Sequence, residues 1–137
     1  MTPAEETVAR AAVACKSWRW MPRMIDDRGR TVLDVDGRGV PCLWHDPASG
    51  SASAYMKPGW ALDEWVGAVP DLTDPATRGC LLALVRKAWG DESVHLAPDR
   101  KRGGRAWRLS NWDDDMPVHI TRRDPAGCLV AALEAAP

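Results

Sequence analysis

The chain has 137 residues, the usual length of one domain and enough to build a buried core. Hydrophobic residues make up 45% and charged residues 27%, a balance that excludes a disordered tail or a low-complexity fibre. The formal net charge of −1 excludes a uniformly basic nucleic-acid binder and a strongly acidic mimic of DNA. We therefore expect a single domain spanning residues 1–137.

The N-terminus carries a helix-start signal. Thr2 and Glu5 have the spacing of a capping box, and Pro3 occupies the first helical position, which predicts a helix over about 3–16. Charged residues interrupt this segment, so it lacks the apolar stretch of a signal peptide. No apolar run approaches the ~18 residues of a membrane span. We expect a protein of the cytoplasm with no membrane partner.

The next elements form a predicted hairpin over about 31–45. Asp36-Gly37 lies between two apolar runs, a pattern typical of a tight hairpin turn. Pro41 cannot donate to a strand ladder, which favours an edge position for the second strand. Residues 46–59 are small and polar and predict a mobile loop.

The clearest helical pattern covers about 75–89, and we expect this helix to be the central core helix. Asp74 precedes it as a capping residue and Gly90 follows it as a terminator. Gly79 lies inside the pattern and indicates close packing at that point. The apolar stripe consists of Leu81, Leu84, Val85 and Ala88.

A second hairpin is predicted over about 93–109, with a third strand at 118–121. Asp124 then begins a C-terminal helix over about 125–135. The sequence therefore predicts an α+β fold in which antiparallel hairpins form a small sheet packed by two or three helices.

The four cysteines are widely separated, and we interpret them as reduced residues of the interior. They are Cys15, Cys42, Cys80 and Cys128. The only short pair of metal-ligating residues, Cys42 and His45, is a weak zinc signal, so we expect no metal and no cofactor.

A basic run at the tip of the second predicted hairpin is the best candidate for contacts with nucleic acid or with an acidic partner. Its members are Arg100, Lys101, Arg102, Arg105 and Arg108. Arginine and lysine contact phosphates, and Gly103-Gly104 would let a backbone approach closely. A solvated hairpin tip that discourages edge pairing is the alternative interpretation, and we favour it for this motif taken alone.

Acidic residues follow this run. Asp113, Asp114 and Asp115 together with His119 suggest a metal-dependent hydrolase. Adjacent carboxylates on a turn diverge, however, which favours a solvated acidic turn. The chain has no nucleophile motif and no phosphate-binding glycine loop, so we expect no enzyme and no catalytic residues.

Eight tryptophans stand beside one tyrosine and no phenylalanine. Tryptophan is enriched at interface hot spots, so those with polar or turn-forming neighbours are candidates for a partner surface. These are Trp18, Trp60, Trp65 and Trp112. The tryptophans beside apolar runs are expected in the core, namely Trp20, Trp44, Trp89 and Trp107.

The segment 70–90, PDLTDPATRGCLLALVRKAWG, resembles one found in small uncharacterised proteins of bacteriophages and prophages from GC-rich hosts. Those proteins also share a Trp-rich opening like 18–22, a hairpin before the central helix and an ending like 129–136. The resemblance implies a phage or prophage origin and no particular activity.

Our leading hypothesis is a non-enzymatic phage accessory protein that binds a host protein or nucleoprotein complex. Its most specific form is an inhibitor of a bacterial defence complex, of the anti-CRISPR type. The first alternative is a small nucleic-acid-binding module that uses the basic 100–108 hairpin. The second is the metal-dependent hydrolase of the acidic turn.

Overall fold

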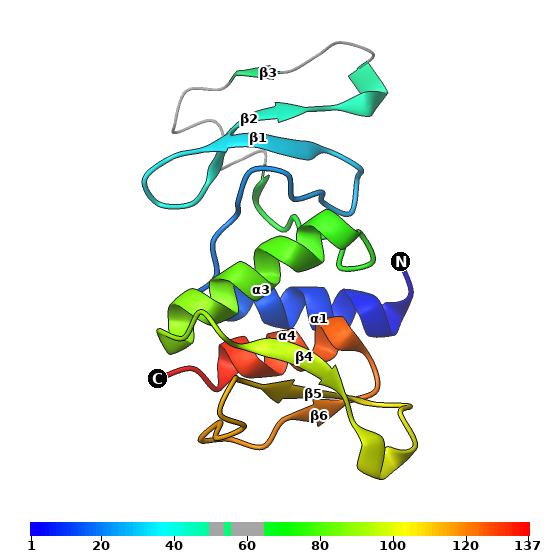
Figure 1. The fold of residues 1–137 in the computed structure, drawn as a ribbon. Helices are drawn as coiled ribbons and strands as arrows, with labels where there is room; N and C mark the ends of the chain where they lie inside the picture. The colour runs from blue at the N-terminus through cyan, green and yellow to red at the C-terminus, as the bar shows by residue number, and fades with distance from the viewer. Residues whose placement is uncertain (50–53, 56–64) are drawn as a thin grey trace.

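Three helices and two small antiparallel sheets are arranged in layers in the computed structural model, which describes residues 1–49, 54–55 and 65–137 (Figure 1). The first sheet lies at one end of the molecule, the helices occupy the middle, and the second sheet lies at the other end. This arrangement confirms the predicted α+β class, but the hairpins form two separate three-stranded sheets instead of one.

The helices begin where the sequence predicts. They are α1 (Pro3–Ala14), α3 (Pro75–Trp89) and α4 (Pro125–Glu134). Thr2 forms the predicted capping box with Glu5, and the carboxylates of Asp74 and Asp124 accept the backbone N–H groups of the first turns that follow them. Among the described residues, no helix is both long enough and apolar enough to cross a membrane.

The first sheet has the strand order β1-β2-β3. Its strands are β1 (Thr31–Val35), β2 (Pro41–His45) and β3 (Ala54–Tyr55). The edge position predicted for the second strand is wrong, because β2 pairs with β1 on one side and β3 on the other. Pro41 fits this central strand because it occupies the first position.

The predicted mobile loop 46–59 is partly ordered. A 3-10 turn, η1 (Pro47–Ser49), follows β2, and β3 pairs with Leu43 and Trp44. The remaining positions of that prediction lie outside the described residues.

The second sheet has the order β4-β5-β6, with the 3-10 turn η2 (Arg100–Arg102) at its tip. The strands are β4 (His95–Pro98), β5 (Trp107–Ser110) and β6 (Thr121–Arg122). The sequence predicts the third strand at 118–121, but β6 lies at 121–122, closer to the C-terminus. The Leu109 N–H donates to the carbonyl of Ile120, immediately before β6 begins to pair with β5.

Helix α4 is the packing centre, although the sequence favours 75–89 for this role. It contacts α1, α3 and all three strands of the second sheet. Six of its ten residues are buried, among them Cys128, Leu129 and Leu133, whereas α3 buries four of fifteen. The short side chains of its alanines let neighbouring elements approach it from several sides.

A buried ion pair lies beneath the first sheet. Arg30 Nη2 lies 2.6 Å from Asp26 Oδ2, and the two side chains are 4% and 0% exposed. The Arg30 guanidinium also stacks over the Trp65 ring, 4.2 Å from its centroid. Trp20 and Trp44 make edge contacts with the same ring. Charge pairing and aromatic packing thus share one small core.

Replacing Arg30 with methionine leaves the Asp26 carboxylate buried without its partner. We expect the free energy of unfolding to fall by about 3–5 kcal/mol, measured by urea denaturation. Arg10→Met is the matched control because Arg10 forms an exposed i,i+4 pair with Glu6. That variant should lose about 0.5 kcal/mol or less. Equal losses in the two variants would contradict a structural role for the buried pair.

Gly79 does not have the close packing that the sequence predicts. It is exposed on α3, and a Cβ added there would meet nothing within 4 Å. Alanine restricts the unfolded chain more than glycine does and fits a helix without strain. We expect Gly79→Ala to raise the free energy of unfolding by about 0.5–1 kcal/mol. A lower thermal unfolding midpoint of Gly79→Ala in calorimetry would contradict this expectation.

Candidate macromolecule-binding surface

The second sheet has two unlike faces. Helix α4 covers one face, toward which Leu96 and Leu109 point as cross-strand neighbours. Side chains on a strand alternate, so the residues between them point to the opposite face. We call this opposite face the outer sheet face; its register places there His95, Ala97, Arg108, Ser110 and Thr121.

Arg108 occupies the middle of the outer sheet face and forms an ion pair. Its Nη1 lies 2.8 Å from Asp114 Oδ1, and the Ser110 hydroxyl donates to the same oxygen over 3.1 Å. These two donors, the Arg108 guanidinium first, lower the pKa of Asp114 from its usual value. Asp114 therefore stays ionised and neutralises Arg108.

The residues 111–115, which we call the acidic turn, are fixed by their own hydrogen bonds. Asn111 Nδ2 donates to Asp115 Oδ1 over 2.7 Å and to Asp91 Oδ2 over 3.2 Å. The backbone N–H of Trp112 donates to the hydroxyl of Ser93. This network presents the Trp112 ring to solvent, where 85% of the residue is exposed.

The acidic turn does not assemble a metal site in the described part of the chain. Asp114 is engaged by Arg108 and Asp115 by Asn111, so their carboxylates face different partners. His119 Nε2 lies 3.4 Å from the Thr121 hydroxyl. Across the residues with assigned positions, no group of three or more His, Cys, Asp or Glu is placed to hold a metal ion.

The predicted basic run partly lines a pocket of about 630 Å³ that extends from the hairpin tip to Asp114 of the acidic turn. Arg100, Lys101 and Arg108 contribute to its wall, together with Asp114 and His119. A second hollow of about 560 Å³ includes Trp112 and His95 and shares Arg108 and Asp114 with the first. The two hollows therefore meet at the Arg108–Asp114 pair.

Backbone contacts hold the tip in place. Asp99 Oδ1 accepts the N–H of Lys101, and the Asp99 carbonyl accepts the N–H of Gly104. Gly103 and Gly104 have φ values of +68° and +73°, which favour glycine. The side chain of Arg102, a predicted contact residue, lies outside the described part of the chain.

Two arginines that the sequence reasoning missed join this end of the sheet. The β5–β6 register places Arg122 opposite Trp107, and Arg123 follows it; both are exposed. In the sequence, only their position just after the predicted strand 118–121 indicated that they could lie near the hairpin tip at 100–105. We call the resulting set the basic end; it comprises Arg100, Lys101, Arg105, Arg122 and Arg123.

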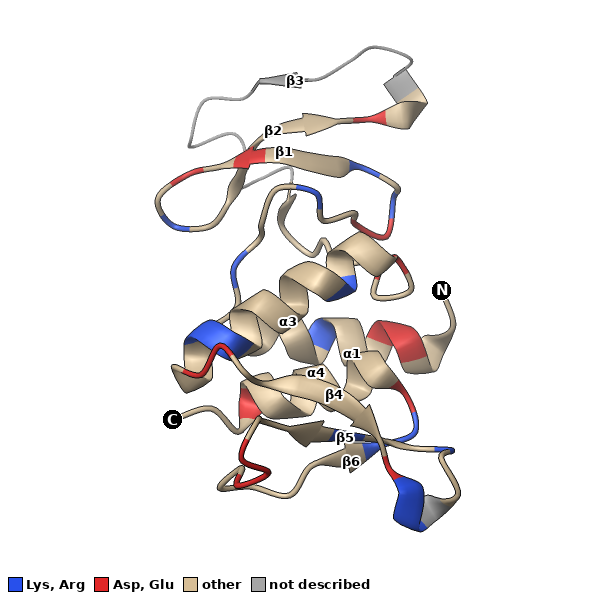
Figure 2. Ribbon diagram, in the orientation of Figure 1, with Lys and Arg blue, Asp and Glu red and all other residues tan. Residues whose placement is uncertain are grey.

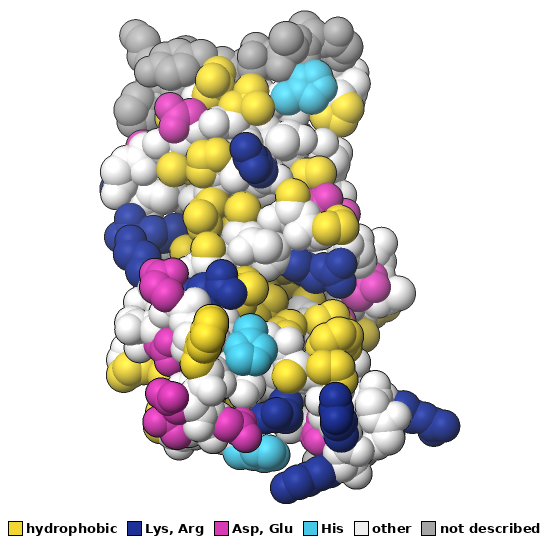
Figure 3. Space-filling model, viewed as in Figure 1, with side chains coloured by type: hydrophobic (Ala, Val, Ile, Leu, Met, Phe, Trp, Pro, Cys, Tyr) yellow, Lys and Arg dark blue, Asp and Glu magenta, His cyan; other side chains and the backbone are white. Residues whose placement is uncertain are grey.

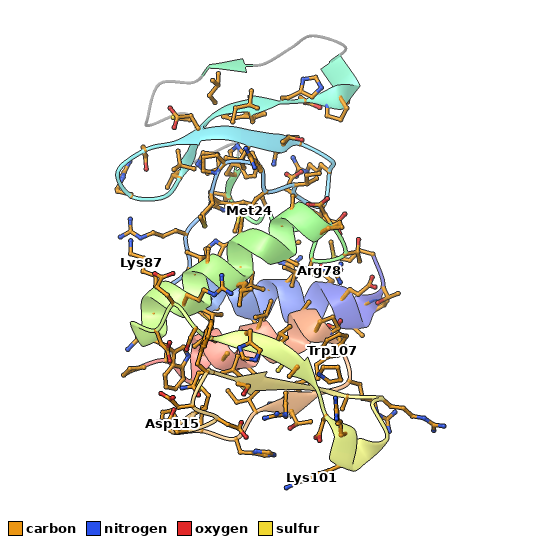
Figure 4. All side chains as sticks on the ribbon, in the orientation of Figure 1. Met24, Arg78, Lys87, Lys101, Trp107 and Asp115 are labelled. Carbon is orange, nitrogen blue, oxygen red and sulfur yellow. The ribbon has the colours of Figure 1, made fainter. Side chains whose placement is uncertain are left out.

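Charge is thus divided between the two ends of the second sheet. Lys and Arg gather at η2 and β6, with Asp99 and Asp124 next to them in the chain, and further Asp residues form the acidic turn (Figure 2). The space-filling view shows the same division on the surface (Figure 3). Lys101 and Asp115 mark the opposite ends in Figure 4. The face is therefore electrostatically polar along its length.

The predicted tryptophan surface is not assembled. Trp65 is 6% exposed, so its assignment to an exposed partner surface is wrong; it packs against Trp20, Trp44 and Arg30. Trp18 is half-buried against the same core. Trp60 lies outside the described residues. Of the four candidates, Trp112 alone is shown to be exposed, and it lies at the second sheet.

The tryptophans predicted in the core are buried to different degrees. Trp20 and Trp44 are 7% and 3% exposed, as expected. Trp89 and Trp107 are only partly buried, although both pack against the core. The indole N–H of Trp89 donates to the Ala132 carbonyl over 2.9 Å, which ties α3 to α4.

The cysteines are free, as predicted, but the expected interior position holds fully only for Cys128, since Cys15, Cys42 and Cys80 are half-buried. Burial raises the pKa of the Cys128 thiol to about 11 and also raises those of Cys15, Cys42 and Cys80. The thiols therefore stay protonated at neutral pH and are weak nucleophiles.

Comparisons with models of protein families, with curated proteins and with solved structures found no match. The resemblance to bacteriophage proteins stays a prediction.

The pH dependence of the Arg108–Asp114 pair can be measured directly. The pKa of Asp114 is lower in the folded protein than in the unfolded chain. The ion pair therefore stabilises the fold fully at a pH above the unfolded pKa of Asp114. This contribution to stability is lost as the pH falls through the folded pKa. In Arg108→Gln, the Asp114 pKa should rise in a carboxyl ¹³C NMR titration. The stability difference from the wild type should shrink as the pH falls. An unchanged Asp114 pKa would contradict the pairing, and Arg10→Gln serves as the remote control.

Proposed function

We propose that this chain is a non-enzymatic accessory protein of a bacteriophage or prophage, and that it binds a host macromolecule through the outer sheet face. The observation that carries this proposal is an exposed Trp112 that shares a hollow with the Arg108–Asp114 pair, with the basic end at the opposite end of the same sheet. Large exposed aromatic rings beside polar groups are typical of interfaces.

Several features support binding in preference to catalysis. The thiols are held protonated by burial, and the carboxylates of the acidic turn are engaged separately. The charged groups instead lie along a surface of two joined hollows. Such a charge pattern orients a large partner and suppresses wrong ones.

The resemblance of segment 70–90 to phage proteins supports a partner in the cytoplasm of a bacterial host. The most specific form of the proposal is an inhibitor of a bacterial defence complex, of the anti-CRISPR type. A host protein or nucleoprotein complex would then contact the polar face, with Trp112 as the aromatic anchor.

Affinity purification from the lysate of a GC-rich bacterial host tests the proposal. We expect a protein or nucleic acid to be enriched over a mock bait. Trp112→Ala should reduce that enrichment about fivefold or more, because truncation of an anchoring aromatic residue costs at least ~1 kcal/mol of binding.

Val66→Ala is the matched control, since Val66 is also an exposed apolar residue, 68% accessible. It should leave the enrichment unchanged. Failure to enrich any macromolecule, or equal loss in the two variants, would overturn the proposal. Circular dichroism of both variants checks that the fold is retained.

A further inference from the structure

We propose that the host macromolecule is a nucleic acid, or contains one, and that the basic end binds its phosphate backbone. This inference rests on the proposed function and names the partner class for the same surface. The positive charges at this end of the sheet would bind a partner rich in phosphate groups.

The first argument is the number of cations that the fold gathers. Arg100 and Lys101 come from η2, Arg105 from the following loop, and Arg122 and Arg123 from β6 and the residue after it. All five are exposed. Four of them are arginines, whose planar guanidinium groups match phosphate oxygens in pairs.

Among the described residues none of these cations lies within ion-pair distance of a carboxylate, although Lys101 is close enough to Asp114 to help lower its pKa. The described ion pairs of the chain use Arg10, Arg30, Arg38 and Arg108 instead. Arg122 Nη1 donates to the carbonyl of Thr121, which positions the guanidinium. The positive charge of the basic end is therefore available to a ligand.

The nearby carboxylates are already engaged in holding the backbone. Asp99 is buried and accepts the N–H of Lys101, and Asp124 accepts the N–H of Gly127 at the start of α4. Asp114 pairs with Arg108. The remaining aspartates of the acidic turn lie at the far end of the sheet, as Lys101 and Asp115 show (Figure 4). The carboxylates of Asp99 and Asp114 line the adjoining pocket, but each already accepts a hydrogen bond from a donor of this chain.

The shape of the tip also suits a polymer backbone. A Cβ added at Gly103 or Gly104 would meet nothing within 4 Å, so the tip is open on that side. The adjoining pocket of about 630 Å³ is large enough for a nucleotide unit. Trp107 is partly buried against the core. Contacts from these exposed cations would go to the phosphate backbone, so we expect little discrimination between bases.

Fluorescence anisotropy with labelled oligonucleotides of one sequence tests the inference, using single-stranded DNA, duplex DNA and single-stranded RNA. The observed association constant should fall steeply as salt rises from about 50 to 200 mM. Changing both Lys101 and Arg105 to glutamine should weaken binding and reduce the slope of log K against log salt by roughly 1–2.

The double variant Lys16→Gln/Arg38→Gln is the matched control. It removes one lysine and one arginine, both exposed and outside the second sheet, so the net charge changes equally. It should bind like the wild type. Equal weakening in the two double variants would show an effect of net charge alone and would overturn the inference.

Two further outcomes would overturn it. One is the absence of oligonucleotide binding even at low salt. The other is displacement of the oligonucleotide by poly-glutamate at an equal concentration of charge, which would assign the basic end to an acidic protein. If a host protein is still captured through Trp112 after nuclease treatment while oligonucleotides fail to bind, the proposed function stands and this inference fails.

Discussion

The buried ion pair of Asp26 and Arg30 fixes the segment by which the first sheet is attached to the helices. Asp26 Oδ1 accepts the backbone N–H of Arg30 over 2.8 Å, while Oδ2 faces the guanidinium. The carboxylate thus closes the loop and compensates a charge that burial would otherwise make unfavourable. On either side, Ile25 N–H donates to the Thr77 hydroxyl, and Asp27 N–H donates to the Val69 carbonyl. The loop therefore couples the first sheet to the start of α3.

The same chain of contacts continues to the outer sheet face. Helix α3 packs on α4, and α4 supports all three strands of the second sheet. Because α4 is apolar on nearly every side, it fills the space between the layers and leaves the polar strand residues to face outward. The charged side chains of the surface consequently extend from a backbone that a packed core supports, apart from those at the tip, which depend on Asp99 and its hydrogen bonds.

Local signals predicted the helices well because capping is decided within a few residues. Thr2, Asp74 and Asp124 each satisfy N–H groups of the next turn, whatever the rest of the chain does. The burial of Trp65 could not be predicted in this way, because it depends on partners brought from residues 20, 30 and 44. The candidate site could be predicted in part. The basic run is evident from the sequence, but the presence of Arg122 depends on the register between β5 and β6.

The division of charge on the second sheet restricts how a partner would lie on it. Neighbouring cations at the basic end repel one another, and a polyanion would relieve that repulsion while releasing its counterions. The carboxylates of the acidic turn would repel the same polyanion, so a phosphate chain would cross the end of the sheet instead of running along the strands. Trp112, beside the acidic turn, would then remain free for a protein contact. A nucleoprotein complex would contact both ends of the surface at once, with its nucleic acid at the basic end and its protein at Trp112.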